Sequence, residues 1–323
     1  MLFGEIEESR DRGTETRFRS LRESAKRERT AVKAKAITIA NKKCGVGKTT
    51  TAVNLAAGLA IKLRHAVMRN ERPARVLLVD LDPQMNALMC LDYGNHEAPY
   101  ELSLPALLFE DAPPPVERLL RSSRRHPNLH YIPSNREGLM RTARQLNTMP
   151  AADLRLKHAL EPVLDDYAYI VIDTPPGGDV LFNNAIMAAS HLLIPIEVSY
   201  QGASGLKALH TDLMKVLKAF RRSDFDILGY LPTMFEEAAK DAQEIVDSMR
   251  QRYGAKTLPS VHRSRVIQQA NGAHMDVFEF APPRSRDGGQ LESSKRATVE
   301  YGLLVEEVVL RAGSPVAEGM HGR

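Results

Sequence analysis

The stretch ANKKCGVGKTTTAVNLA, Ala40–Ala56, follows a short β-branched run and leads into a run with helical spacing. Its residues Gly47, Lys48 and Thr49 match the end of the phosphate-binding P-loop pattern G-x-x-x-x-G-K-[ST], whose first glycine falls on Lys42 here. A strand, a glycine loop and a helix in this order bring backbone N–H groups and a helix N-terminus to a phosphate. The stretch therefore predicts a phosphate-binding loop of unusual type in an α/β domain.

The composition of the chain indicates a soluble globular protein. Its 323 residues, 43% of them hydrophobic and 26% charged, are enough for one large domain or two modest ones. No run approaches the roughly 18 apolar residues of a membrane helix, and we expect no signal peptide. Cys44 and Cys90 have neither disulfide nor metal spacing, which favours a reducing cytoplasm. The net charge of +4 permits an anionic partner without requiring one.

Three regions differ in composition. Residues 1–34 are dense in charged side chains and poor in large apolar ones, so we predict a charged N-terminal extension that is mobile or helical. An arm that binds DNA or a partner is the alternative for this region. Residues 35–312 carry the alternating apolar and helical runs described below and are predicted to form one domain, and residues 313–323 are predicted to be a flexible tail.

Apolar runs and helical runs alternate along most of the chain. We predict strands within residues 34–40, 74–84, 128–135, 167–178, 190–198 and 225–235. Runs that are apolar at every position suit parallel strands covered on both faces. The fold class is therefore α/β, with a mostly parallel sheet and helices on both faces, of the P-loop NTPase type. The segment 64–73 is predicted to be an exposed connection.

Chemically useful side chains follow three of these strands. In open α/β sheets, ligands bind outside the carboxyl ends of the strands. Lys48 is placed to hold β- and γ-phosphates, and the Thr49 hydroxyl to ligate Mg²⁺. Asp82 can orient an attacking water, and Asp173 can support the metal, partly through water. A single aspartate would more often be a helix cap, but the coincidence at three strand ends favours a site.

Several motifs in the same order resemble the ParA family of partitioning ATPases, in the ParA/MinD group with a deviant Walker A loop. KCGVGKTT at Lys43–Thr50 resembles the family's first motif, and VLLVDLDPQ at Val76–Gln84 resembles its second. YIVIDTPP at Tyr169–Pro176 and GAHMDVFEFAP at Gly272–Pro282 are similar to later family segments. The likeness runs from about residue 35 to about residue 311.

The resemblance implies an ATPase that uses ATP and Mg²⁺. It implies nucleotide contacts from Lys43, Cys44, Gly45, Val46, Gly47, Lys48, Thr49, Thr50 and Asp173, and metal contacts from Thr49, Asp82 and Asp173. It also implies catalytic roles for Lys43, Lys48 and Asp82. Lys43 is the family's signature lysine, which reaches the phosphates bound by the other subunit of an ATP-sandwich dimer. A cation given across that interface would link dimer formation to nucleotide occupancy.

Two residues depart from the family pattern. Cys44 replaces a loop glycine, so we expect its Cβ to change the backbone or to press on the nucleotide. Met85 replaces the glycine that usually follows DPQ, near the expected attacking water. Both departures bear on nucleotide affinity and hydrolysis rate, and neither removes a charged group that the chemistry needs.

The resemblance implies a slow ATPase whose dimer binds DNA without sequence preference. A ParB-like partner then stimulates hydrolysis and release, which segregates plasmid or chromosome DNA. Such a protein is cytoplasmic and associated with the nucleoid. The basic residues expected at the DNA are Arg250, Arg252, Lys256, Arg263 and Arg265.

The sequence disfavours two other functions and leaves a third open. A MinD-like membrane-cycling ATPase would need a basic amphipathic C-terminal helix, but residues 297–311 carry Glu300, Glu306 and Glu307. An iron–sulfur reductase would need cysteines after the third and fourth strands, and Cys44 and Cys90 lie at neither place. A ParA-like ATPase that positions a different cargo remains open.

Overall fold

The computed structural model describes residues 33–69, 74–177, 180–199, 206–239, 241–280 and 289–313. Residues 1–32 and 314–323 lie outside this part of the chain. The predicted N-terminal extension and C-terminal tail fall almost wholly within those two segments, so both remain predictions.

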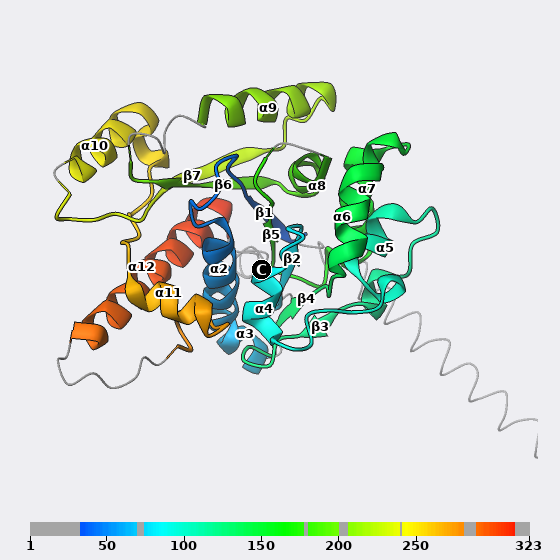
Figure 1. The fold of residues 1–323 in the computed structure, drawn as a ribbon, viewed down its shortest axis with the longest axis horizontal. Coiled ribbons are helices and arrows are strands. Elements are labelled where there is room, and N and C mark those ends of the chain that lie inside the picture. The colour runs from blue at the N-terminus through cyan, green and yellow to red at the C-terminus, as the bar shows by residue number, and fades with distance from the viewer. Residues whose placement is uncertain are drawn as a thin grey trace, which may run out of the picture.

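The described residues form a seven-stranded sheet in the order β3-β4-β2-β5-β1-β6-β7 (Figure 1). The strands are β1 (Lys35–Ile39), β2 (Val76–Asp80), β3 (Arg121–Ser122), β4 (Leu129–Tyr131), β5 (Tyr169–Asp173), β6 (His191–Glu197) and β7 (Asp226–Thr233). All neighbouring pairs are parallel except β3 and β4, which are antiparallel at one edge. The predicted mostly parallel α/β sheet is confirmed.

Helices cover both faces of this sheet. They are α2 (Lys48–Lys62), α3 (Arg64–Met68), α4 (Asn86–Asp92), α5 (Leu104–Phe109), α6 (Arg136–Gln145), α7 (Arg155–Leu160), α8 (Val180–Ala188), α9 (Leu206–Ala219), α10 (Ala242–Tyr253), α11 (Arg265–Gly272) and α12 (Gly289–Ala312). On one face α2, α4 and α12 share a hydrophobic cluster with the strands. On the other face α5, α7, α8 and α9 pack over two further clusters (Figure 1).

The central strands explain where the site lies. Every residue of β2 and of β5 is buried, as expected for continuous apolar runs covered on both faces. Strand pairing places Asp173 opposite Asp80 on one side and opposite Ile39 on the other. The carboxyl ends of the central strands β1, β2 and β5 therefore lie side by side, and the glycine loop begins there.

Two local features differ from the sequence-based picture. In the segment predicted as an exposed connection, the described residues 64–69 are exposed except Ala66, but they begin with a short helix, α3 (Arg64–Met68), which the sequence did not predict. Strand β3 was not predicted, because its two residues are too few to show an alternating pattern. It pairs antiparallel with β4 through Arg121 and Ser122.

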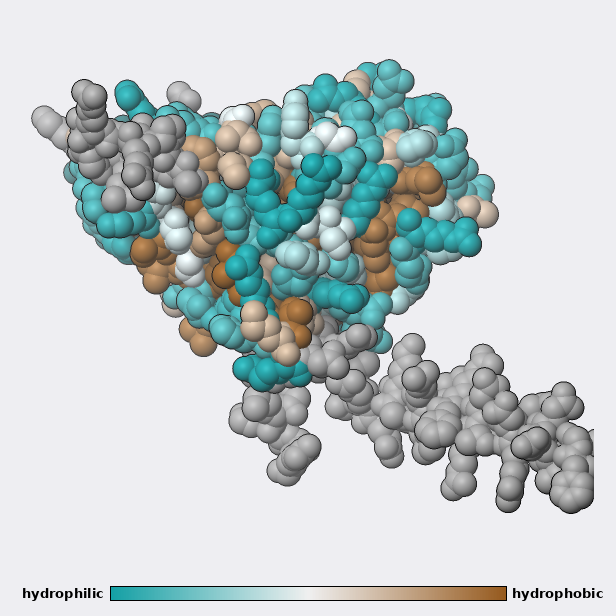
Figure 2. Space-filling model, turned by 90° about the horizontal axis from the view of Figure 1, so that it is seen from below, coloured by the Kyte–Doolittle hydropathy of each residue, from teal (hydrophilic) through white to brown (hydrophobic). Residues whose placement is uncertain are grey.

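Figure 2 shows the molecule from below, relative to Figure 1. The surface on this side is mostly hydrophilic. Polar side chains separate the apolar patches on this face. Exposed large apolar side chains of the described residues include Met68 of α3, which is 79% exposed, and Leu310 of α12, which is 77% exposed. They lie on two different helices.

Close packing of α2 against α12 depends on Gly58. A Cβ built at Gly58 would lie 2.5 Å from Val305 Cγ2 and 3.1 Å from the Phe278 ring. Val305 is β-branched and buried, so its side chain has few rotamers to move into. Gly302 on α12 offers a contrast, because a Cβ there meets no atom within 4 Å.

We predict that Gly58→Ala lowers the free energy of unfolding, because overpacking of about 1–3 kcal/mol exceeds the helix-propensity gain of up to about 1 kcal/mol. Gly302→Ala should instead raise it by about 0.5–1 kcal/mol. Chemical denaturation of both variants measures the difference. Equal stabilisation by the two substitutions would contradict the close approach at Gly58.

Candidate active site

The loop between β1 and α2 is shaped by two glycines. Gly45 and Gly47 have φ values of 73° and 86°, in the left-handed region that favours glycine. Val46 between them is fully buried, and its carbonyl oxygen accepts a 2.9 Å hydrogen bond from Thr233 Oγ1. The amide of Asn41 anchors the start of the loop: Oδ1 accepts from Lys43 N at 3.0 Å, and Nδ2 donates to the Pro195 carbonyl. The loop is thus fastened to the ends of β6 and β7.

Lys48, the first residue of α2, is turned back over the loop. Its side chain is buried, and Nζ donates a 3.0 Å hydrogen bond to the Lys43 carbonyl oxygen. Burial lowers the pKa of Lys48, and the negative charges of Asp173 and Asp82 act in the opposite direction. The sequence-predicted phosphate lysine therefore lies inside the loop with carboxylates nearby.

Asp173 ends β5 and is fully buried. Its Oδ1 accepts a 3.1 Å hydrogen bond from Thr174 N, whereas its buried Oδ2 has no hydrogen-bond partner among the described residues. Burial raises the pKa of Asp173, and the nearby Thr49 hydroxyl opposes that rise. A buried carboxylate oxygen without a partner, beside a hydroxyl, fits a hard cation with oxygen ligands such as Mg²⁺.

The two aspartates of the DLD sequence have different environments. Asp80 is fully buried: Oδ1 accepts from Asp82 N at 2.9 Å, and Oδ2 accepts from Ala87 N and Leu88 N in α4. Asp80 therefore fixes the loop to the first turn of α4. Asp82 is half-buried, and its Oδ1 accepts from Gln84 N at 2.9 Å. The negative charge of Asp82 acts on both Lys48 and Asp173, so Asp82 belongs to the same site.

The structure distinguishes the two departures from the family pattern. Cys44 is exposed and does not have a positive φ, so its own backbone conformation is one that cysteine adopts without strain. Met85 does have a positive φ, of 55°, while its side chain is buried. A non-glycine residue in the left-handed conformation is uncommon, which is consistent with glycine being the usual residue there.

The signature lysine makes an ion pair within its own chain. Lys43 Nζ lies 2.5 Å from Glu197 Oε2 at the end of β6, and Arg263 Nη2 lies 3.7 Å from Glu197 Oε1. Sequence reasoning gave Glu197 no role. Its signal was a single acidic residue at the end of the otherwise apolar run LLIPIEV.

Two more polar residues at the site were missed from the sequence. Thr233 at the end of β7 supports the loop, as described above. Asn271 of α11 donates a 3.0 Å hydrogen bond from Nδ2 to Thr50 Oγ1. Nothing near Asn271 in the sequence marks it as a neighbour of the loop, because the two residues are far apart along the chain.

The residues expected at DNA fall into two groups. Arg250 and Arg252 are on α10 with Lys256 just beyond, whereas Arg265 is the first residue of α11 and Arg263 lies two residues before it. Three of the five form ion pairs. Arg250 pairs with Asp247, Lys256 with Asp226, and Arg263 with Glu236 and Glu197. Arg252 instead lies over the Tyr253 ring, 5.6 Å from its centroid.

Comparison with known proteins agrees with this geometry. The family model described as an AAA domain matches residues 34–227. The chromosome partitioning protein ParA of Myxococcus xanthus is 36% identical over 66% of this chain and 70% of its own length. The sporulation initiation inhibitor protein Soj of Bacillus subtilis is 32% identical over 78% of this chain and 93% of its own.

A solved structure shares the fold. Cobyrinic acid a,c-diamide synthase from Mycobacterium smegmatis, with bound ATP analog and magnesium, superposes with a TM-score of 0.64. The likeness covers 90% of this chain and 97% of that one, at 23% sequence identity. At this identity the likeness shows the shared fold. From the family model, the named relatives and the loop geometry together, the chain belongs to the ParA family of P-loop ATPases.

Proposed function

We propose that this protein is a partitioning ATPase that binds ATP with Mg²⁺, dimerises, binds DNA without sequence preference, and releases it after slow hydrolysis stimulated by a ParB-like partner. The observation that carries the proposal is the grouping of buried Lys48, Thr49 and the unpartnered Asp173 oxygen around the glycine loop. The Myxococcus relative, named as a chromosome partitioning protein, supports DNA as the cargo.

Each residue of the site has a role in this proposal. Backbone N–H groups of the loop and the N-terminus of α2 bind phosphate oxygens, and Lys48 balances the charge of the β- and γ-phosphates. Thr49 and Asp173 hold Mg²⁺, which neutralises negative charge on the phosphates when bound. Asp82, which is half-buried, orients the water that attacks the γ-phosphate.

Dimer formation in this proposal requires Lys43 to change partner. In a single chain its ammonium group is held by Glu197 at 2.5 Å. A nucleotide bound to the facing subunit offers several negative charges in place of that one carboxylate. Without nucleotide, the two loops bring lysines together and repel each other. ATP therefore favours the dimer, and the ATP-bound form is the DNA-binding form.

Partitioning is favoured over a MinD-like membrane cycle. None of the helices in the described part of the chain is both long and apolar enough to cross a membrane. The glutamates of α12 also face partners within the domain: Glu300 contacts His262, Glu306 pairs with Lys62, and Glu307 pairs with Arg311. With its glutamates engaged in this way, α12 lacks the basic polar face that an interfacial membrane helix uses.

We predict that Lys43→Ala keeps ATP binding but abolishes the ATP-dependent dimer, because the cation that crosses the interface is lost. Lys42→Ala is the matched control, since it removes the same charge one residue earlier, where Lys42 pairs with Asp212. Light scattering with and without ATP measures the dimer. A Lys43→Ala protein that dimerises like the wild type would overturn the cross-subunit role.

Lys48→Ala and Asp82→Ala should fail in different ways. Lys48→Ala loses nucleotide binding, because the β- and γ-phosphates then lack a lysine in their own subunit. Asp82→Ala keeps ATP bound and slows hydrolysis by about 100-fold or more, which traps the dimer. Filter binding and phosphate release distinguish the two outcomes. Hydrolysis at the normal rate by Asp82→Ala would show that this aspartate is misassigned.

Cys44 provides a chemical probe of the loop. It is exposed, whereas Cys90 is 7% exposed and burial raises the pKa of Cys90 to about 12. An alkylating reagent should therefore modify Cys44 first in the nucleotide-free protein, and ATP with Mg²⁺ should protect it by covering the loop. Peptide mapping after timed labelling tests this. If ATP does not change the labelling of Cys44, Cys44 does not lie at the nucleotide. Cys44→Gly should make nucleotide binding insensitive to the alkylating reagent.

A further inference from the structure

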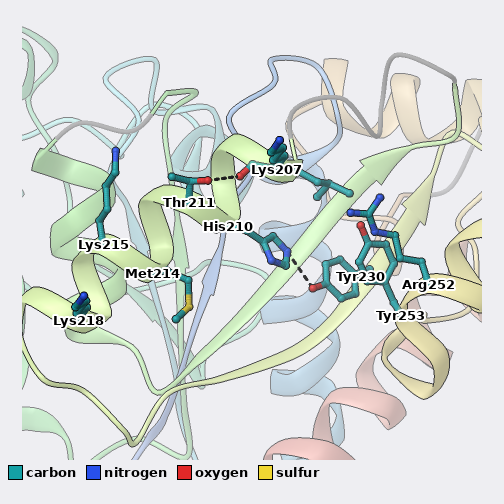
Figure 3. A pocket seen from close by; sticks show the side chains of 10 residues that line it. Lys207, His210, Thr211, Met214, Lys215, Lys218, Tyr230, Arg252 and Tyr253 are labelled. Atoms are coloured by element: carbon teal, nitrogen blue, oxygen red, sulfur yellow. Dashed lines mark hydrogen bonds between the residues drawn. The ribbon is translucent and has the colours of Figure 1, made fainter.

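A cavity of about 700 Å³ lies between α9, α10 and β7, on the face of the sheet opposite α2 (Figure 3). We call it the α9–α10 groove. Its lining includes Lys207, Lys215 and Lys218 from α9, and Arg252 from α10. None of the lining residues is an aspartate or a glutamate. The side chains that line the groove are therefore cationic or neutral.

The cations of the groove are mostly available to a ligand. Lys215 lies 3.5 Å from Asp212, in the weak ion pair typical of exposed helix neighbours. Among the described residues, Lys207, Lys218 and Arg252 form no ion pair with a carboxylate. By contrast, Arg250 and Lys256 nearby are paired with Asp247 and Asp226. An anionic partner would gain more from the groove than from those two residues.

The lysines form a row. Lys207, Thr211, Lys215 and Lys218 are spaced by four, four and three residues, so they share one side of α9 (Figure 3). At 1.5 Å per residue the row extends roughly 16 Å along the helix. A compact anion would reach only one end of it. A row of this length suits a linear polyanion with charges at regular intervals.

The floor of the groove is apolar and aromatic. Tyr253 stacks on Tyr230 with ring centroids 3.8 Å apart, and His210 Nε2 lies 3.0 Å from the Tyr230 hydroxyl (Figure 3). Met214, which is 61% exposed, lies between the lysines of the row. Burial and the charge of Arg252 lower the pKa of His210, so its ring adds no cation at neutral pH. The groove thus combines an apolar and aromatic floor with cationic side chains, one of which, Arg252, lies over the Tyr253 ring.

We propose that the α9–α10 groove contacts the phosphate backbone of DNA through Lys207, Lys215, Lys218 and Arg252. The proposal rests on the DNA-binding function proposed above, and it moves the main contact away from the paired residues Arg250, Lys256 and Arg263. Lys207, Lys215 and Lys218 span most of α9, and a stiff duplex with a phosphate at every nucleotide can reach all three without being ordered. A flexible acidic peptide would lose conformational entropy on lying along the same row, so DNA is favoured.

The test is a salt titration of DNA binding by the full chain with ATP and Mg²⁺. The groove variant is Lys207→Ala/Lys215→Ala/Lys218→Ala. The control variant is Lys62→Ala/Lys157→Ala/Lys295→Ala, which removes the same charge from three lysines outside the groove. Two of them are paired with Glu306 and Glu292. Each lost phosphate contact should reduce the log–log slope by about 0.9, so the groove variant loses about 2.7 per protomer. The control should keep the wild-type slope.

ATP-dependent dimerisation and the ATPase rate are measured on both variants. Wild-type values show that the nucleotide site is intact. If the wild type binds DNA and the groove variant binds equally well, the groove assignment is wrong and the partitioning function stands. If the wild type with ATP binds no DNA, both the groove assignment and the proposed partitioning function are wrong. Polyglutamate is a further probe: tighter binding than DNA, lost in the groove variant, would assign the groove to an acidic peptide and overturn the proposal.

Discussion

The buried carboxylate of Asp173 is the feature on which the rest of the site depends. It lies at the end of a fully buried strand, with one oxygen lacking a partner among the described residues. An ionised carboxylate in such a place is costly unless a cation or a hydrogen-bond donor compensates it. Lys48 and Thr49, at the start of α2, lie close enough to compensate it in part, and Mg²⁺ would complete the compensation. The sheet register that places Asp173 between β1 and β2 therefore also determines where phosphate can bind.

Much of this arrangement follows from the sequence, because its signals are local. The apolar runs at β2 and β5 have no alternation, which predicts parallel strands buried on both faces. Gly45, Gly47 and Lys48 lie within a few residues of each other, so their pattern identifies the loop directly. The same reasoning predicted Asp173 and Asp82 from their positions at strand ends.

Contacts between distant segments could not be predicted in this way. Glu197 meets Lys43 only because β6 lies next to β1, and Asn271 meets Thr50 only because α11 folds back on α2. The two aspartates of DLD look alike in sequence, yet the fold uses Asp80 to hold α4 and leaves Asp82 half-exposed. The sequence also could not show which loop residues are left-handed, and these are Gly45 and Gly47, not Cys44. The α9–α10 groove could not be predicted either, because it forms only where the fold brings α10 and β7 next to α9.

The most direct test of the central claim is the effect of Mg²⁺ on ATP affinity, measured by calorimetry in wild type and in Asp173→Asn. If Asp173 supports the metal, Mg²⁺ tightens ATP binding in the wild type. The variant should bind metal-free ATP with similar affinity but gain little from Mg²⁺. An equal gain from Mg²⁺ in both proteins would contradict this account of the site.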